Sequence, residues 1–259
     1  MKKIIEILKR LVKYPYFLLL EAEVLLKGFW WKLRGGKVPA SHSIPIIINN
    51  YNRLSMLKQL LSSLEQRGYN NIIILDNCST FPPLLEFYKE TCYRVVFLDE
   101  NYGFLALWKA PGLFKQFKNQ FYVYTDPDVV LDEGCPDDFM SYFLDVMKRY
   151  PACQKVGFGI RIDDLPDCYK EKNYVLWWER RHWEHPYGEN LYKARTDTTF
   201  ALYRPYCKGG HSSHLVLRTG FPYVIRHLPW YLDTDNLSEE EQYYIKHVKK
   251  PSMWSGLLK

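Results

Sequence analysis

Residues 121–128 read FYVYTDPD, an apolar run of strand-forming residues that ends abruptly in two carboxylates. Aromatic and β-branched side chains are enriched in strands, so the run predicts a buried strand that delivers two acids to the edge of a sheet. Pro127 disfavours a helical conformation for the residue before it, and residues two apart on an extended chain project to the same side. Asp126 and Asp128 would then be neighbouring hard oxygen ligands for a divalent cation that holds a diphosphate.

Acids two residues apart also occur in ordinary turns, because aspartate and proline are common turn residues. The chain offers an internal comparison at Asp233 and Asp235, which no apolar strand precedes and which we interpret as a turn. Just beyond them, Ser238 and Glu241 have the spacing of a capping box, which predicts a helix from there until Pro251. Spacing alone is therefore weak evidence, and the surrounding sequence must decide.

The composition is that of a globular protein, with 47% hydrophobic and 25% charged residues in a chain of 259, enough to bury a full core. The 21 Tyr, 14 Phe and 8 Trp indicate surfaces that stack on flat groups, although dense aromatic packing would look the same. The six cysteines form no C-x-x-C pair, so we expect reduced thiols in a cytosolic protein, with neither a zinc site nor a disulfide framework.

The excess positive charge is confined to residues 1–37, which hold nine Lys or Arg and three Glu, whereas the rest of the chain has 26 basic and 26 acidic residues. In residues 2–13, apolar side chains fall at helical spacing and basic ones fill the other face, as in helices that lie on anionic membranes. Residues 16–31 are strongly apolar, but a spanning helix would have to bury two glutamates and a lysine there.

We therefore predict a peripheral protein on the cytoplasmic, inner face of the cell membrane, attached through residues 1–37. The alternative is a helical hairpin packed on the body. A signal peptide fits poorly, because no small-residue cleavage site follows a clean apolar core. Nucleic acid is not an expected partner, since no basic stripe continues into the body.

Four apolar segments beyond this region are predicted strands, at residues 44–48, 72–75, 94–98 and 121–125. Leucines at helical spacing predict a helix at 54–64 between the first two, and residues 82–90 supply a shorter one between the second and third. Successive strand starts lie 22 to 28 residues apart, which suits strand-helix-strand units with right-handed crossovers. The first half is therefore predicted to be a parallel sheet of nucleotide-binding type.

Ligands of such sheets bind beyond the carboxyl ends of the strands, where this chain carries polar segments. They are NNYNR (49–53), DNCST (76–80), NYGF (101–104) and DPD (126–128). All four should face one crevice. The crevice lacks a glycine-rich phosphate loop, so a diphosphate would be held there through metal.

These segments resemble the motifs of family 2 glycosyltransferases of the GT-A fold, over roughly residues 44–135. IIINNYNR (46–53) is similar to the family's opening strand and Tyr-Asn-Arg turn, and DNCS (76–79) to the second-strand Asp-x-x-Ser that contacts the nucleotide base. NYG (101–103) resembles the family's asparagine-glycine turn, and DPD its metal-binding Asp-x-Asp.

The resemblance implies an α/β fold of GT-A type, with a Rossmann-like, mostly parallel sheet flanked by helices and an N-terminal helical membrane-associating segment. Residues 38–135 would be the half that binds the nucleotide sugar, and 136–259 the acceptor-binding half with a C-terminal helix. The donor would most often be a uridine diphosphate sugar, with Mn²⁺ or Mg²⁺ as the metal. The donor-binding residues would be Asn50, Tyr51, Asn52, Arg53, Asp76, Asn101, Gly103 and Asp126.

The metal ligands would be Asp126, Asp128 and His227. His227 lies in RHLPWY (226–231), which resembles the late histidine that completes metal coordination in many GT-A enzymes. Imidazole is an acceptable ligand for manganese. A structural histidine is the alternative.

The family's catalytic base, a Glu-Asp pair, has no counterpart after residue 135. Asp197 is the first candidate, because it precedes a strand-like run at 198–203, and Glu179 is the next. Asp197 could instead accept hydrogen bonds from nearby groups. The tryptophans of residues 177–183 could form a platform for a sugar or lipid, or could be interior packing with Arg180 and Arg181 stacked on the rings.

The predicted function is transfer of a sugar to a glycan or lipid-linked glycan acceptor, as in the assembly of a bacterial surface polysaccharide. Inversion of the anomeric centre is the family expectation, and retention stays open because the base motif is missing. One alternative is a non-catalytic GT-A-fold protein that binds sugar or serves as a scaffold. Another is a sugar nucleotidyltransferase, although that class normally has a glycine-rich basic loop after the first strand.

Overall fold

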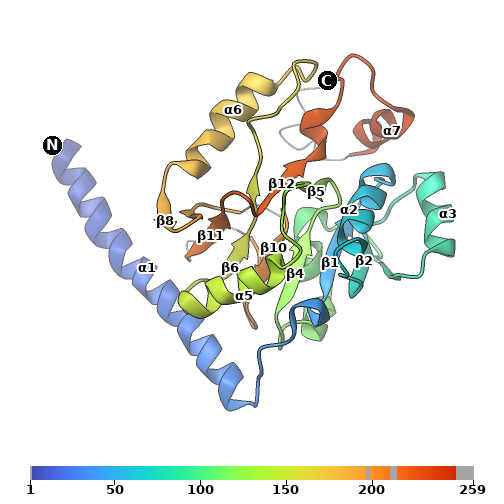
Figure 1. The fold of residues 1–259 in the computed structure, drawn as a ribbon. Helices are drawn as coiled ribbons and strands as arrows, with labels where there is room; N and C mark the ends of the chain where they lie inside the picture. Colours follow the sequence, from blue (N-terminus) through green and yellow to red (C-terminus); the bar gives the residue numbers. More distant parts are fainter. Residues whose placement is uncertain (1, 197–198, 211–214, 249–259) are drawn as a thin grey trace.

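The computed structural model describes residues 2–196, 199–210 and 215–248, with side chains described from residue 15 onward. Within these residues the chain is an α/β fold whose helices flank a nine-stranded mixed sheet (Figure 1). The strands of this sheet are β1 (Ile46–Asn50), β2 (Ile72–Asp76), β3 (Arg94–Phe97), β4 (Tyr122–Thr125), β6 (Lys155–Gly157), β8 (Pro186–Gly188), β9 (Leu191–Lys193), β10 (Ala201–Tyr203) and β11 (Val216–Thr219). Their order is β3-β2-β1-β4-β10-β6-β11-β9-β8.

The first half of the sheet is parallel, as predicted. β1 pairs in parallel with both β2 and β4, and β2 with β3. The helices between these strands, α2 (Ser55–Glu65) and α3 (Pro82–Glu90), are also confirmed. The carboxyl ends of β1 to β4 therefore lie along one edge of the sheet.

The second half departs from the prediction of a mostly parallel sheet. β10 runs antiparallel to both β4 and β6, and β9 antiparallel to both β11 and β8, while β11 is parallel to β6. A smaller sheet has the order β5-β12-β7, with β5 (Val129–Leu131), β7 (Gly159–Ile160) and β12 (Val224–His227). These strands have two to four residues, too few for a periodic pattern to reveal their direction.

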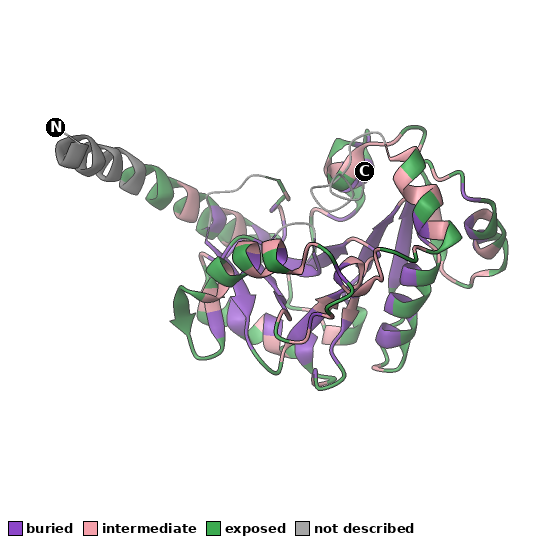
Figure 2. Cartoon of the chain, turned by 90° about the horizontal axis from the view of Figure 1, so that it is seen from above, coloured by how far each residue is buried: buried purple, intermediate pink, exposed green. Residues whose placement is uncertain are grey.

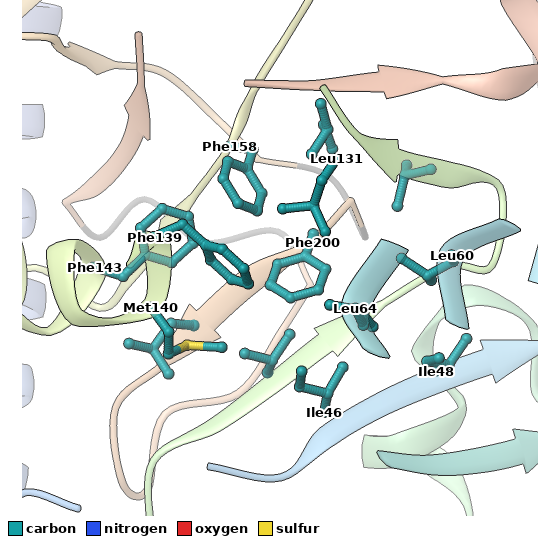
Figure 3. Packing of buried hydrophobic residues seen from close by; sticks show 14 of the residues in the cluster. Ile46, Ile48, Leu60, Leu64, Leu131, Phe139, Met140, Phe143, Phe158 and Phe200 are labelled. Carbon is teal, nitrogen blue, oxygen red and sulfur yellow. The ribbon is translucent and has the colours of Figure 1, made fainter. Parts of the chain in front are cut away.

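Both faces of the parallel strands are buried, which explains their continuous apolar sequences. Ile46 and Ile48 of β1 belong to the larger core, to which α2, α3 and α5 (Phe139–Arg149) contribute. Ile47 points to the opposite face and packs in a smaller core beneath α4 (Ala106–Lys109). The ring of Phe139 lies 5.2 to 6.1 Å from those of Phe143, Phe158 and Phe200 at the centre of the larger core (Figure 3).

The N-terminal segment is one continuous helix, α1 (Lys2–Leu33), so the alternative of a helical hairpin is wrong. Its N-terminal end extends away from the body (Figure 1), and its C-terminal part carries buried residues where it packs against the body (Figure 2). Trp31 is buried there, where its Nε1 donates to the Asn119 carbonyl oxygen at 2.9 Å and its ring meets Phe121 edge-on. No helix in the described part of the chain combines the length and apolar character needed to cross a bilayer.

The end of α1 is held by close packing on a glycine. Gly36 N–H donates to the Trp31 carbonyl oxygen at 3.0 Å, and a β-carbon at Gly36 would lie 2.3 Å from the indole ring. The Gly35-Gly36 pair, which ends the basic segment, therefore belongs to the seat of Trp31. The two remaining helices are α6 (Lys172–Arg180) and α7 (Glu239–His247). α7 begins where the capping box predicts, and Ser238 Oγ accepts from the Glu241 backbone N–H.

The aromatic core makes a direct prediction about stability. Phe139→Ala removes a fully buried ring and should lower the free energy of unfolding by about 3–5 kcal/mol, because the cavity cannot fully collapse. The matched control is Phe97→Ala on the edge strand β3, where the side chain is 63% exposed; it should cost less than about 1 kcal/mol. Urea denaturation measures both, and equal losses would contradict the assigned core.

Candidate functional site

The polar segments that follow β1, β2 and β3 are joined by hydrogen bonds. The Nδ2 atoms of Asn49 and Asn77 both donate to the Gly103 carbonyl oxygen, at 3.3 and 3.0 Å. Asn77 Oδ1 accepts from the Tyr102 backbone N–H at 2.8 Å. The structure therefore gathers these three segments at the carboxyl edge of the sheet, as expected from the sequence.

Gly103 owes its place to its backbone conformation. Its φ of +69° lies in the left-handed region, which a β-carbon disfavours. Its N–H donates to Asn101 Oδ1 at 2.9 Å, which closes a tight turn. Both residues were predicted to contact the donor, and the hydrogen bonds show at least that they shape the turn beside β1 and β2.

Asn50 and Asn52 use part of their amide groups inside the protein. Asn52 Oδ1 accepts from the backbone N–H groups of Thr80 and Phe81 at 2.7 and 3.0 Å, and so holds the segment that leads into α3. Asn50 Nδ2 donates to the Tyr88 hydroxyl at 2.8 Å. Their predicted contacts with the donor stay predictions, but both side chains already have a structural task.

Asp76 ends β2 and is buried. Its Oδ2 accepts from the Ser79 backbone N–H at 3.0 Å, so the Asp-x-x-Ser segment forms a turn; its predicted contact with the nucleotide base stays a prediction. Burial raises the pKa of Asp76, and hydrogen bonds from Ser79 only partly offset this. A hydrogen-bond donor on a ligand would therefore stabilise the charged carboxylate.

Asp128 and His227 come together although 98 residues separate them in the chain. Asp126 and Asp128 follow β4, and β5 begins at once and pairs antiparallel with β12, with His227 opposite Val129. The Leu228 N–H donates to the Asp128 carbonyl oxygen at 2.8 Å. His227 Nε2 lies 3.7 Å from Asp128 Oδ1.

The Asp128–His227 pair offers a divalent cation one carboxylate and one imidazole. Within the described residues, no three His, Cys, Asp or Glu side chains gather closely enough to hold a metal ion by themselves. Mg²⁺ sites, however, are usually made by one or two carboxylates together with substrate phosphates and water, and imidazole is an acceptable ligand for Mn²⁺. Asp128 and His227 therefore fit a cation that arrives with a diphosphate, whereas Asp126 does not complete a set of three protein ligands with them.

α7 also contributes to this edge of the sheet, which its sequence does not indicate. Arg53, predicted to contact the donor, is 5% exposed and forms an ion pair with Glu241 of α7. Burial alone would lower the pKa of Arg53, but Glu241 and Asp128 raise it, so the guanidinium is firmly charged. Burial raises the pKa of Glu241, as does the charge of Asp128, while Arg53 opposes both. The capping-box spacing already accounts for Glu241 as part of a helix start, so it gives no indication of the ion pair with Arg53.

Of the two candidate bases, only Glu179 lies within the described residues. Asp197 lies outside the described residues; the adjoining Thr196 is held by a hydrogen bond of 2.8 Å from the buried Lys155 ammonium to its carbonyl oxygen. Glu179 is described and is 4% exposed. Its Oε2 accepts from Arg218 Nη1 at 2.7 Å, and its Oε1 lies 3.9 Å from His182 Nε2. Glu179 would have to leave this ion pair to act as a base.

The tryptophans of α6 differ in exposure, with Trp177 at the surface and Trp178 half-buried. Trp177 is 67% exposed, so interior packing is wrong for this residue. The Arg181 guanidinium lies 3.4 Å above the Trp178 ring, as the alternative of stacked arginines expected. A surface pocket of about 590 Å³ adjoins Trp177 and is lined also by Leu176, Arg180, Arg181 and Glu184.

The remaining sequence expectations concern turns and thiols. Asp233 Oδ1 accepts from the Asp235 backbone N–H at 3.0 Å, which confirms the turn in the comparison segment. All six cysteines are free, and half of them are buried: Cys78, Cys92 and Cys168 are exposed, and Cys135, Cys153 and Cys207 are buried. Comparison with known proteins adds nothing further, since neither a protein-family model nor a curated protein matches this chain.

The burial of His182 beside Glu179 and Arg218 predicts how stability depends on pH. Burial, with a smaller contribution from Arg218, lowers the pKa of the adjacent His182 to about 4 from its ordinary 6.5. The unfolded chain therefore takes up the proton first, and stability should fall as the pH falls from 6.5 towards 4. His182→Gln should flatten this decline in urea denaturation at pH 7 and pH 5. The exposed His185→Gln should keep the wild-type slope, and an unchanged slope in His182→Gln would refute the assignment.

Proposed function

We propose that this protein is a metal-dependent glycosyltransferase of the GT-A type, similar to family 2 enzymes. It would transfer a sugar from a nucleotide diphosphate sugar, most often linked to UDP, to a glycan or lipid-linked glycan. The observation that carries the proposal is the distance of 3.7 Å between Asp128 and His227, beside the carboxyl ends of four parallel strands. The order of polar segments that resembles the family supports it independently.

The chain's own groups have distinct tasks in this reaction. Asp128 and His227 would hold the cation, with Asp126 either beside them on the metal or on the ribose. Mn²⁺ or Mg²⁺, when bound, supplies electrostatic stabilisation of the charge that develops on the leaving diphosphate. Asp76, the segment at residues 50–53 and the turn at Asn101 and Gly103 would form the part of the crevice that takes the nucleoside.

A carboxylate must remove the proton from the acceptor hydroxyl as it attacks the anomeric carbon, a contribution of about 10² to 10⁴ in rate. Asp197 is the preferred base, because Glu179 is engaged by Arg218. One displacement of this kind inverts the anomeric centre, in keeping with the family expectation.

A sugar-binding protein without catalysis is the second candidate. The pairing of Glu179 with Arg218 favours it, because that pairing leaves one fewer acid ready to act as a base. Such a protein would bind the nucleotide sugar with Mn²⁺ but would not turn it over. Measuring donor hydrolysis alongside donor binding therefore separates the two candidates.

The metal proposal is tested by Asp128→Asn, which keeps the size of the side chain and removes its charge. Manganese-dependent hydrolysis of a UDP sugar should fall by about 10²-fold or more, because the charge on the leaving group loses its stabilisation. The matched control is Asp235→Asn, which alters the same Asp-x-Asp spacing in an exposed turn and should leave turnover unchanged. Full activity in Asp128→Asn would refute the metal assignment.

We also propose that α1 attaches the protein to the anionic inner face of the cell membrane. Val24 and Trp31 on one face of the helix are buried against the body. The opposite face carries apolar side chains that are 47% to 69% exposed: Leu18, Leu19, Leu25, Leu26, Phe29, Trp30 and Leu33. Helical spacing places these residues in one stripe, which could enter the lipid interface while the helix stays attached to the body.

Charge supports the same orientation. The whole excess of basic residues lies within residues 1–37, and anionic lipids attract such segments. Glu23 is partly neutralised by Lys27, whose Nζ lies 2.5 Å from Glu23 Oε1. A helix that lies in the interface keeps both groups hydrated, whereas a spanning helix would not.

Substitution tests this attachment more sharply than truncation, which would expose the seat of Trp31. Leu26→Gln combined with Phe29→Gln should weaken binding to vesicles of phosphatidylcholine and phosphatidylglycerol at least about tenfold, since each apolar side chain contributes about 1.5–3 kcal/mol when buried. Co-sedimentation measures the effect. The control, Phe97→Gln, changes an exposed ring on β3 and should bind as wild type does; equal binding by all three proteins would contradict the proposal.

A further inference from the structure

α6 is fixed to the body by one face, and other side chains of the helix line a surface pocket. Val175 is fully buried, and four residues further on Glu179 pairs with Arg218 of β11 at 2.7 Å. Residues four apart lie on the same face of a helix, so Leu176 and Arg180 form the neighbouring row. The pocket is lined by Leu176, Trp177, Arg180, Arg181 and Glu184. Its volume of about 590 Å³ is that of a small-ligand site.

The pocket belongs to the half of the fold that carries His227. After α6, the short turn η4 (Arg181–Trp183) packs against Gly159 of β7, where a β-carbon would lie 2.7 Å from the Trp183 ring. β7 pairs in parallel with β12, which ends at His227. The turn that follows α6 therefore rests on the small sheet that holds a proposed metal ligand.

Trp177 gives the pocket an exposed aromatic face. Its side chain is 67% exposed, and its ring centroid lies 5.7 Å from that of Tyr174 and 6.3 Å from that of Trp178. An aromatic ring beside a few polar groups is the usual composition of a small-ligand pocket. A flat ring of this kind can pack on the apolar face of a sugar.

Two arginines make the pocket positive. The Arg181 guanidinium stacks on Trp178, with 3.4 Å from Cζ to the ring centroid, so its plane is held. Among the described side chains, neither Arg180 nor Arg181 forms an ion pair. With Glu184 as the acid in this lining, two arginines and one glutamate leave one positive charge. Guanidinium groups bind phosphate through paired N–H donors, so the pocket is suited to a phosphate.

We infer that this pocket binds a phosphorylated sugar, whose ring stacks on Trp177 and whose phosphate is held by Arg180 and Arg181. The sugar is the acceptor of the proposed transfer, so the inference rests on the proposed function. Glu184 accepts hydrogen bonds from sugar hydroxyls. An uncharged glycan would not use the arginines. Two acceptors share the required chemistry: a lipid-linked glycan whose first sugar carries a diphosphate, and a free phosphorylated glycan.

Calorimetric titration with N-acetylglucosamine 1-phosphate, without Mn²⁺ or nucleotide, tests the inference. Arg180→Gln combined with Arg181→Gln should weaken binding about tenfold or more, because charge-assisted hydrogen bonds to the phosphate are lost. Trp177→Ala should weaken it about fivefold, whereas Trp177→Phe should keep most of the affinity. The matched control is Arg149→Gln, which removes an exposed arginine from the last position of α5 and should bind as the wild type does.

Several outcomes would overturn the inference. They are no binding by the wild type, equal binding by the double arginine variant, equal affinity for unphosphorylated N-acetylglucosamine or for inorganic phosphate, and displacement of the sugar phosphate by UDP, which would assign the pocket to the donor. Sugar phosphate binding by a protein that does not turn over UDP sugars would instead overturn the proposed function and leave the pocket in place.

A second probe identifies the source of the phosphorylated sugar. N-acetylglucosamine linked through a diphosphate to a farnesyl chain carries the same sugar on a short lipid. Tighter binding of this probe than of the soluble sugar phosphate, lost in the double arginine variant, would identify a lipid-linked glycan as the acceptor. Equal or weaker binding would identify a free phosphorylated glycan.

Discussion

The backbone ladder between β5 and β12 is the constraint on which the site depends. β5 starts one residue after Asp128, and β12 ends at His227, so their antiparallel pairing brings the two side chains to the same end of the small sheet. The Leu228 N–H then fixes the Asp128 carbonyl. Because main-chain hydrogen bonds set this register, the two side chains are brought together independently of the long connection between the two strands.

The first half of the fold could be predicted from local sequence patterns, whereas the second half depends on pairing between distant strands. The four parallel strands and the helices between them are recognisable from local sequence patterns. Both faces of these strands are buried, so each strand is a continuous apolar run. The second half is built from strands of two to four residues, whose direction is set by pairing with distant partners. The antiparallel placement of β10 between β4 and β6 has no local signature, so the prediction of a mostly parallel sheet failed there.

The candidate site divides along similar lines. The sequence predicts that the acids after β4 lie beside the polar turns after β1 to β3, because the carboxyl ends of parallel strands share one edge of the sheet. The ion pair between Arg53 and Glu241 could not be predicted, since the two residues are 188 apart in the chain and no sequence spacing indicates their contact. Asn52 illustrates a subtler limit. Its motif predicts a contact with the donor, but its amide oxygen holds the segment before α3, and a sequence motif does not distinguish these tasks.

The seat of Trp31 on Gly36 has a mechanical consequence. α1 has 32 residues, which corresponds to about 48 Å at 1.5 Å per residue, and among its described side chains the buried ones are Val24 and Trp31, in its C-terminal third. A rigid rod held at one end magnifies any rotation at its pivot: a tilt of about 10° moves the far end of a 48 Å helix by about 8 Å. A side chain at residue 36 would displace the indole ring and turn the whole lever. The absence of a side chain at Gly36 thus helps to set the direction in which α1 points.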